Sequence, residues 1–355
     1  MKNKRIIILL ILLILICNVI IILLSKLKQR LTNIENIPDF NNKDNRHFPH
    51  RYFTDNNGKV LPIVAVSAPY RDDEQKDKYY FYESLGIFII GITAYKNFPN
   101  KIIDHTEGDY NKKDDFEYTS KIKNWLCCFR NPEYYGFTSN NNLLDMSESD
   151  FYNAEDYADV EKEYDFIYIC NKDSDDCPLD GWNAINRNYD LAIKCFPILF
   201  NEFKLKGLIV GRIGCGLEEL YGDRVEITDF LDYFVLQDYM KKSKFLFVPN
   251  IYDASPRVVA ECLTKNLPVL MNINIVCGFK YINDKTGVLF SDEGDFKASL
   301  TKLLENIKNN TISPREWWRQ NYSQDKCQKV LRDFLYSNNN VNNSLENVER
   351  VRFIV

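Results

Sequence analysis

Residues 244–271 read KFLFVPNIYDASPRVVAECLTKNLPVLM, and this stretch decides the fold. An apolar run ends in a turn at Pro249, a helical stretch follows, and a second apolar run closes the segment. Ser255 is a favourable helix N-cap, and Pro256 suits the first helical position, where its missing N–H is not needed. The pattern predicts free backbone donors just beyond the carboxyl end of a strand, where α/β sheets bind anionic ligands.

Two acidic residues bracket this turn, Asp253 in the loop and Glu261 in the helix. A carboxylate beside a phosphate site suits a sugar or ribose hydroxyl presented next to the phosphate. The pair therefore predicts a nucleotide-sugar site. A second interpretation is a surface salt bridge, because Arg257 and Glu261 are four positions apart on one helix face.

The segment resembles the C-terminal half of group 1 (family 4-like) glycosyltransferases of GT-B fold. Their signature is an acidic residue, seven residues, a glutamate with a small residue, and a later Pro-Val strand. Here it reads Asp253, seven residues, Glu261-Cys262 and then Pro268-Val269. Two departures are an aspartate at 253, where the family usually has glutamate, and Asn266, where it usually has glycine.

The resemblance implies an α/β protein of GT-B architecture, with two Rossmann-like domains facing a cleft. It implies a retaining, metal-independent transfer from a UDP- or GDP-linked sugar to a glycan or lipid-linked acceptor, without a cofactor. Glu261 would accept hydrogen bonds from ribose hydroxyls, and Asp253 would hold hydroxyls of the donor sugar at the catalytic centre. N–H groups near Ser255 and Arg257 would face the diphosphate.

Strands and helices alternate over residues 164–336, the order typical of a parallel doubly wound sheet. We expect about six strands, with helices at 183–203, 230–242, 293–307 and 314–336. The last helix resembles the family's closing segment, which packs back across the interdomain cleft. Residues 61–163 predict a reduced N-terminal domain, with strands at 61–68 and 87–95, a helix at 79–86 and a third strand near 143–151.

The chain begins with an uncharged run at residues 6–24, about 19 residues or roughly 28 Å as a helix, enough to span a bilayer. Because charged residues follow directly, we expect an uncleaved signal anchor over 1–30, in a type II orientation with an ER- or Golgi-like lumenal body. The Asn-, Asp- and Lys-rich residues 31–60 predict a disordered stem, and 337–355 a disordered tail. Sequons at Asn309, Asn321 and Asn342 would permit glycosylation.

Four further residues are candidates for the chemistry. Lys172, after the strand at 165–170, and Arg212, after the next strand, are the first and second candidates for binding the diphosphate. Arg71 follows a strand of the first domain and is a candidate for the acceptor side. His105 is a candidate for a role near the acceptor hydroxyl. For each of these four, an ordinary solvated side chain is the alternative interpretation.

Composition limits the other classes of function. A net charge of −5 and a pI of about 5.5 argue against a nucleic-acid partner. The ten cysteines show no pair at zinc spacing, so no metal is expected. Cys170 and Cys177 flank a polar loop and could bridge it in a lumenal body, but for most of the ten cysteines we expect isolated buried thiols. Two rival functions stay open, a non-catalytic sugar-nucleotide or glycan-binding protein of the same fold and a sugar-nucleotide epimerase.

Overall fold

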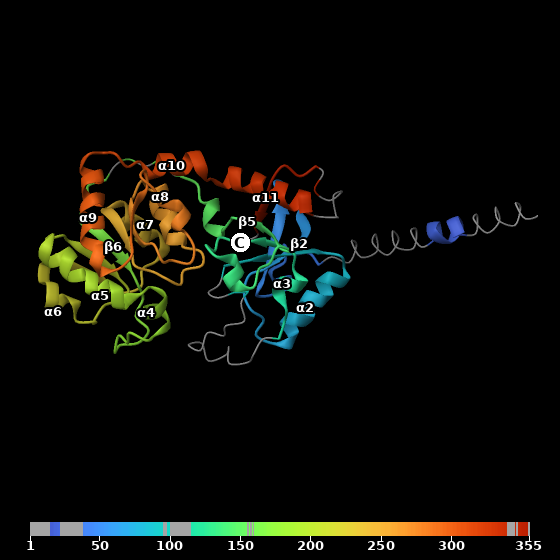
Figure 1. The fold of residues 1–355 in the computed structure, drawn as a ribbon, viewed down its shortest axis with the longest axis horizontal. Coiled ribbons are helices and arrows are strands. Elements are labelled where there is room, and N and C mark those ends of the chain that lie inside the picture. Colours follow the sequence, from blue (N-terminus) through green and yellow to red (C-terminus); the bar gives the residue numbers. More distant parts are fainter. Residues whose placement is uncertain are drawn as a thin grey trace, which may run out of the picture.

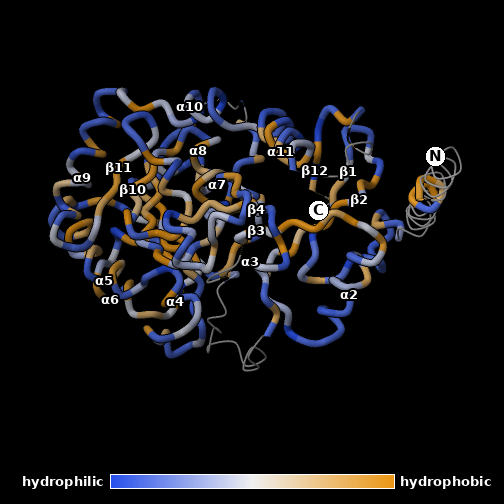
Figure 2. Tube along the Cα trace, turned by 45° about the vertical axis from the view of Figure 1, so that its right-hand side comes forward, coloured by the Kyte–Doolittle hydropathy of each residue, from blue (hydrophilic) through white to orange (hydrophobic). Residues whose placement is uncertain are grey.

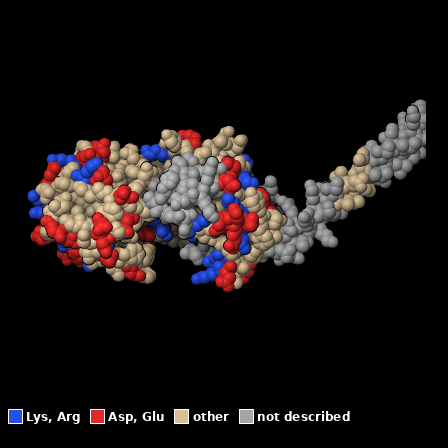
Figure 3. Space-filling view, turned by 90° about the horizontal axis from the view of Figure 1, so that it is seen from below, with Lys and Arg blue, Asp and Glu red and all other residues tan. Residues whose placement is uncertain are grey.

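The computed structural model describes residues 15–21, 38–94, 98–99, 115–154, 156, 158, 160–338, 345 and 347–353. This part of the chain forms two α/β domains, each built on a six-stranded sheet (Figure 1). Hydrophobic positions concentrate inside each domain, and hydrophilic ones cover the outer helices (Figure 2). Acidic and basic side chains are intermixed over the face in Figure 3.

The C-terminal sheet is parallel throughout, in the order β11-β10-β9-β6-β7-β8. Counted from β6, this is the 3-2-1-4-5-6 order of the doubly wound dinucleotide-binding fold, and the order reverses between β6 and β9. The predicted six-stranded parallel sheet is confirmed. Its strands are β6 (Tyr164–Ile169), β7 (Gly207–Val210), β8 (Val225–Thr228), β9 (Ser243–Val248), β10 (Val269–Asn272) and β11 (Gly287–Phe290).

Helices cover both faces of this sheet. The predicted helix at 183–203 is interrupted, because Asn188 adopts a left-handed conformation at φ 51° and a π-helical turn follows Pro197. The helical segments are α4 (Trp182–Asn186), α5 (Tyr189–Pro197), η5 (Ile198–Glu202), α6 (Leu217–Tyr221), η6 (Gly222–Arg224), α7 (Tyr233–Lys241), α8 (Arg257–Thr264), η7 (Phe279–Tyr281) and α9 (Glu293–Lys308).

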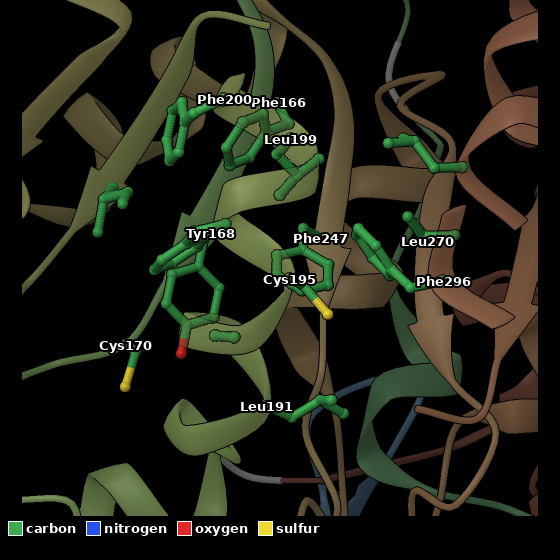
Figure 4. Packing of buried hydrophobic residues seen from close by; sticks show 14 of the residues in the cluster. Phe166, Tyr168, Cys170, Leu191, Cys195, Leu199, Phe200, Phe247, Leu270 and Phe296 are labelled. Atoms are coloured by element: carbon green, nitrogen blue, oxygen red, sulfur yellow. The ribbon is translucent and has the colours of Figure 1, made fainter. Parts of the chain in front are cut away.

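Aromatic side chains dominate the core on one face of the sheet. Phe166 and Phe247 project from neighbouring strands toward Phe200 of η5 and Phe296 of α9 (Figure 4). All four side chains are almost fully buried. Such large buried rings contribute a major share of core stability. They hold the strands rigidly, so the loops at the carboxyl ends of the strands have a fixed frame.

The N-terminal sheet has the order β12-β1-β2-β3-β4-β5. β2 to β5 run parallel, and β1 pairs antiparallel with both β2 and β12. The strands are β1 (His50–Asp55), β2 (Val60–Val66), β3 (Phe88–Ile92), β4 (Asn124–Leu126), β5 (Asn142–Leu144) and β12 (Val351–Phe353). The helices are η1 (Lys43–Asn45), α2 (Asp73–Ser84), α3 (Tyr118–Lys121), η3 (Pro132–Tyr135) and η4 (Glu148–Phe151).

The predicted disordered stem is wrong from residue 38 onward. Phe40 is fully buried beside Tyr52 and Tyr82, and β1 is an internal strand of the sheet. The segment is polar in composition, but its few aromatic residues fill the core. Residues 31–37 lie outside the described residues.

The predicted disordered tail is also wrong where it is described. β12 pairs with β1, and the ring of Phe353 lies 4.7 Å from that of Phe53. Leu345 and Val351 are fully buried. Apolar residues spaced along this polar segment therefore anchor it to the N-terminal sheet.

The predicted closing helix is two helices, α10 (Pro314–Asn321) and α11 (Gln324–Asn338). In α10, Trp318 is buried and its Nε1 donates to the carbonyl of Tyr152 at 2.8 Å. In α11, Leu331 and Leu335 pack into the core of the N-terminal domain. The expected crossing back to the first domain is confirmed, and the N-terminal domain therefore includes α11 (Figure 1).

The two domains are joined by specific contacts between their facing loops. A disulfide links Cys128, after β4, to Cys277, after β10. The buried carboxylate of Asp150 accepts from Lys280 Nζ at 2.9 Å and from the Tyr281 hydroxyl. Because both lysine and tyrosine come from the C-terminal domain, this buried network fixes the orientation of the domains.

A second disulfide rules out the possible bridge between Cys170 and Cys177. Cys177 is bonded to Cys215, whereas Cys170 is a free, buried thiol. The bridge therefore joins the loops after β6 and β7 instead of closing a single loop.

The predicted membrane span at 6–24 is described only over residues 15–21, which are helical. None of the helices in the described ranges is both long enough and apolar enough to cross a bilayer.

His50, assigned from sequence to the stem, is buried at the start of β1 and gives the fold a sensitivity to acid. Its Nδ1 lies 3.1 Å from the carbonyl of His47, and its ring packs edge-on against Tyr82. Burial lowers the pKa of His50 from 6.5 to about 4. The unfolded chain therefore binds a proton that the folded chain does not, between these two pH values.

We expect the free energy of unfolding to fall by about 3 kcal/mol from this group as the pH decreases from 6.5 through 4. Urea unfolding at a series of pH values measures this slope. The His50→Phe variant should flatten it, while His47→Gln, at a more exposed histidine, should leave most of it. An unchanged slope in His50→Phe would contradict the assignment.

Candidate functional site

The candidate site lies where the order of the C-terminal sheet reverses, at the carboxyl ends of β6 and β9. Open α/β sheets bind their ligands in the crevice at this position. A small cavity of about 30 Å³ is present there. Its lining includes the polar side chain of Arg187, from the turn after α4, and those of Asn250 and Asp253, from the loop after β9. Pro256, the N-cap of α8, and Val259 of α8 also line it.

Asp253 and Arg187 form an ion pair in this cavity. Asn250 also donates to the Asp253 carboxylate, at 3.2 Å, and the backbone N–H of Ser255 lies 3.3 Å from it. The Asp253 side chain is 15% exposed, and its charge raises the pKa of the Arg187 guanidinium above the usual value. A fixed cation and a fixed carboxylate therefore face the same small space.

Asparagine side chains hold the loops that carry this pair. Asn188 Nδ2 donates to the carbonyl of Pro249 at 3.1 Å, and Asn272 Nδ2 donates to the same carbonyl at 3.2 Å. Asn188 is also the left-handed residue that separates α4 from α5, a conformation that asparagine tolerates. This break places Arg187 at the end of α4, next to Asp253.

Sequence reasoning missed Arg187, because it fell inside the predicted continuous helix at 183–203. The signal available was the triplet Asn186-Arg187-Asn188, since asparagine disfavours helix interiors and favours turns. A helix break at this triplet would have moved Arg187 to a loop at the strand ends.

Glu261 is buried on the inner side of α8. It accepts from the Tyr152 hydroxyl at 2.8 Å and from Gln237 Nε2 at 3.0 Å. Burial and the charge of Glu261 raise the pKa of Tyr152 above its usual value. Arg257, one turn earlier, is exposed and has no ion-pair partner among the described residues, so the alternative salt bridge does not form.

Ser255 is not the N-cap of α8. The helix begins at Arg257 with Pro256 as the N-cap, and no side chain caps it. The Ser255 hydroxyl lies 3.2 Å from that of Ser147 and 3.1 Å from that of Ser149, both in the N-terminal domain. The hydroxyl is thus used in the domain junction.

The two predicted cations occupy different surroundings. Lys172 pairs with Asp175 at 2.7 Å in the loop after β6. Arg212 is fully buried, with its guanidinium 4.0 Å from the ring centre of Tyr189 and its Nη2 2.9 Å from the Cys170 sulfur. Both follow strands that end at the same edge of the sheet as the cavity, but neither residue lines it.

The remaining candidates lie outside this cluster. Arg71 is exposed in the N-terminal domain, with its guanidinium 4.7 Å from the ring centre of Phe48. His105 lies outside the described residues. The sequence-predicted residues Asp253, Ser255, Arg257 and Glu261 come together around the start of α8. Over the described ranges, no group of three or more His, Cys, Asp or Glu side chains is arranged to hold a metal ion.

No family model and no curated protein sequence matches this chain. Solved structures do match its fold. The structural match to TarM covers 69% of this chain and 50% of TarM, at 16% sequence identity and a TM-score of 0.50. The match to the pneumococcal O-GlcNAc transferase GtfA in complex with UDP and GlcNAc covers 73% of this chain and 55% of GtfA. The sequence identity is 12% and the TM-score is 0.50.

The match to the lipopolysaccharide outer core galactosyltransferase WaaB covers 74% of this chain and 73% of WaaB, at 12% sequence identity and a TM-score of 0.52. The chain thus spans about half the length of TarM and GtfA and nearly three quarters of WaaB. The expected architecture is confirmed: the chain has the two-domain GT-B fold shared by these glycosyltransferase structures.

Proposed function

We propose that the protein is a glycosyltransferase that moves a sugar from a UDP- or GDP-linked donor to a glycan or lipid-linked acceptor. The observation that carries this proposal is the Arg187–Asp253 pair at the switch point of a doubly wound sheet. The fold is shared with GtfA, whose structure holds UDP and GlcNAc, and with WaaB, a galactosyltransferase.

In the reaction, the bond from the anomeric carbon to the diphosphate breaks, and the diphosphate leaves with the electron pair. The acceptor oxygen bonds to the anomeric carbon, and its proton passes to the leaving phosphate oxygen. Negative charge on the diphosphate rises, so fixed cations and aimed N–H groups lower the barrier. Arg187, Arg257 and the amides at the start of α8 would supply that charge, which fits metal-independent transfer.

The carboxylates would bind the sugar parts of the donor. Asp253 would hold hydroxyls of the transferred sugar. In a retaining reaction the acceptor oxygen bonds to the anomeric carbon on the side from which the phosphate departs. Glu261 would accept from the ribose hydroxyls, since its two protein partners use only part of its roughly four acceptor positions. We assign the diphosphate to Arg187 ahead of Lys172 and Arg212, which pair or pack elsewhere.

A membrane-anchored form with a lumenal body is also proposed. The uncharged run at 6–24 supports the anchor. Two disulfides, Cys128–Cys277 and Cys177–Cys215, support an oxidising compartment.

A sugar-nucleotide-binding protein without turnover is the second candidate. The observation that favours it is that protein groups already engage both acidic residues, and the cavity beside Asp253 has a volume of only about 30 Å³. Turnover, not binding, separates the two functions.

A thermal-shift screen tests the proposal, with UDP, GDP and their sugars added to a protein lacking residues 1–37. The cut keeps Phe40 and β1, which the core requires. At a concentration of 100 times Kd we expect stabilisation by about 2.7 kcal/mol, or a rise in Tm of about 5 °C. Release of free sugar from the stabilising donor would establish turnover. No shift with any of these nucleotides would sink both candidates.

A further inference from the structure

The carboxylate of Glu261 is held by two donors that come from outside its own helix. The Tyr152 hydroxyl donates to Oε1 at 2.8 Å, and Gln237 Nε2 donates to Oε2 at 3.0 Å. Gln237 lies on α7, whereas Tyr152 follows η4 in the segment that leads from the N-terminal domain to β6. One donor on each oxygen restricts rotation of the carboxyl group and leaves further lone pairs on both oxygens for a ligand.

The Gln237 amide contacts Glu261 at a cost to its own hydrogen bonding. The side chain belongs to a residue that is only 7% exposed, and its Oε1 is buried without a hydrogen-bond partner among the described residues. A buried acceptor without a partner is unfavourable, and such a group in a folded protein calls for an explanation. With the amide reversed, Oε1 would face the carboxylate, and two acceptors would oppose each other. The observed orientation therefore favours a firmly held carboxylate over a fully paired amide.

Tyr152 is fixed at its backbone, its ring and its hydroxyl. Its carbonyl accepts from Nε1 of Trp318, a fully buried residue of α10, and its ring packs against the core of the C-terminal domain. α10 precedes α11, which packs on the N-terminal domain. The outgoing and the returning connection between the domains therefore meet at Tyr152, and its hydroxyl carries that contact to Glu261.

The Tyr152 hydroxyl stays a donor at and above neutral pH. Burial and the charge of Glu261 raise the pKa of Tyr152, so the hydroxyl keeps its proton. Hydrogen bonds to an ionised acceptor are roughly twice as strong as those between neutral groups. The contact is therefore strong enough to select one orientation of the carboxylate.

This orientation matters for a ligand with two neighbouring hydroxyl groups, such as a ribose. A carboxylate accepts from both hydroxyls only when its free lone pairs face them. We propose that Tyr152 and Gln237 are positioning residues that orient the Glu261 carboxylate toward the ribose hydroxyls of the donor nucleotide. The inference rests on the proposed function, in which Glu261 binds the ribose. It also links donor binding to the junction of the domains, because Tyr152 belongs to the segment that joins them.

Calorimetry of the full chain with UDP and with 2′,3′-dideoxy-UDP tests the proposal, or the guanosine pair if the thermal-shift screen selects GDP. The natural chain should bind UDP about tenfold more tightly than the dideoxy form, because the hydroxyls donate to a charged acceptor. In Tyr152→Phe and in Gln237→Met, each of which removes one donor, this ratio should fall to about threefold or less. A variant that merely loosened the fold would weaken the binding of both nucleotides alike and leave the ratio unchanged.

Tyr164→Phe is the matched control, since the Tyr164 hydroxyl donates to Glu226 at 2.7 Å in an equivalent pair. Tyr164 begins β6 and therefore lies at the opposite end of that strand from the candidate site. This variant should keep the natural ratio.

If Tyr152→Phe or Gln237→Met also keeps the natural ratio, that residue does not position Glu261. A natural chain that binds UDP and its dideoxy form equally well overturns the inference and leaves the proposed function standing. A natural chain that binds neither UDP nor GDP overturns the proposed function, and the inference with it.

Discussion

The Arg187→Met variant is expected to turn over its nucleotide-sugar donor about 100-fold more slowly than the natural chain. Methionine keeps much of the packing of the arginine stem but removes the cation that faces the departing diphosphate. Loss of one preorganised charge-stabilising group at a reacting centre costs roughly this much in kcat. The measurement is steady-state release of nucleoside diphosphate with the donor identified by the thermal-shift screen.

Two further variants separate a role at the reacting atoms from a general effect of charge. Arg187→Lys should recover part of the rate, because it restores the charge without the planar guanidinium. Arg224→Met removes an arginine of the same domain whose hydrogen bond is to the carbonyl of Lys204, outside the cavity, and should have full activity. If Arg187→Met were as active as Arg224→Met, the diphosphate assignment would be wrong.

Replacing both cysteines of the interdomain disulfide with serine should lower the free energy of unfolding by up to about 5 kcal/mol. The two residues are 149 positions apart, and a bridge that closes a long loop restricts the unfolded chain strongly. The closed loop contains β6 to β10, so the variant also removes the covalent link between the domains and leaves the Asp150 network to hold them together. Urea unfolding of both proteins under non-reducing conditions measures the difference.

The second disulfide provides the internal comparison. Cys177 and Cys215 are 38 positions apart, and both belong to the C-terminal domain, so their removal should cost at most about 4 kcal/mol. It should not alter the coupling of the domains. Equal unfolding curves for the natural chain and the Cys128→Ser, Cys277→Ser double variant would refute the interdomain bridge.

The C-terminal domain was largely predictable from sequence, because its strands are continuous apolar runs separated by helical patterns. Buried parallel strands have this appearance, and each was located within a few residues. The interruption at Asn188 was missed because the apolar period continues across it. Local pattern alone does not show that a single residue reverses its backbone conformation.

The N-terminal domain was less predictable, because its sheet is completed by pairing between distant segments. The contact of β12 with β1 joins residues about 300 positions apart, and β12 is only three residues long. Polar composition favoured disorder in both segments, yet a few apolar residues such as Phe40 and Val351 are enough to anchor them. The Cys177–Cys215 pairing was equally inaccessible, since spacing does not define connectivity.

The candidate site was also only partly predictable from the sequence. Asp253 and Glu261 could be predicted as candidates from the sequence, because their spacing in one strand–helix unit is a local feature. The position of Arg187 beside Asp253 depends on two loops brought together from different parts of the chain. The hydrogen-bond partners of Glu261 come from α7 and from the segment near Tyr152, which no spacing within α8 could reveal.

The N-terminal domain contains segments of the chain that precede the C-terminal domain and segments that follow it, namely α11 and β12. This order has a consequence for biosynthesis. While a nascent chain emerges, residues 164–308 can collapse as one contiguous unit, but β1 lacks one of its two neighbouring strands until β12 has left the ribosome. Until then β1 presents open backbone donors and acceptors, a surface prone to pair with other chains. A stop codon shortly before residue 351 should therefore yield an aggregating product even though every strand of the second sheet is intact.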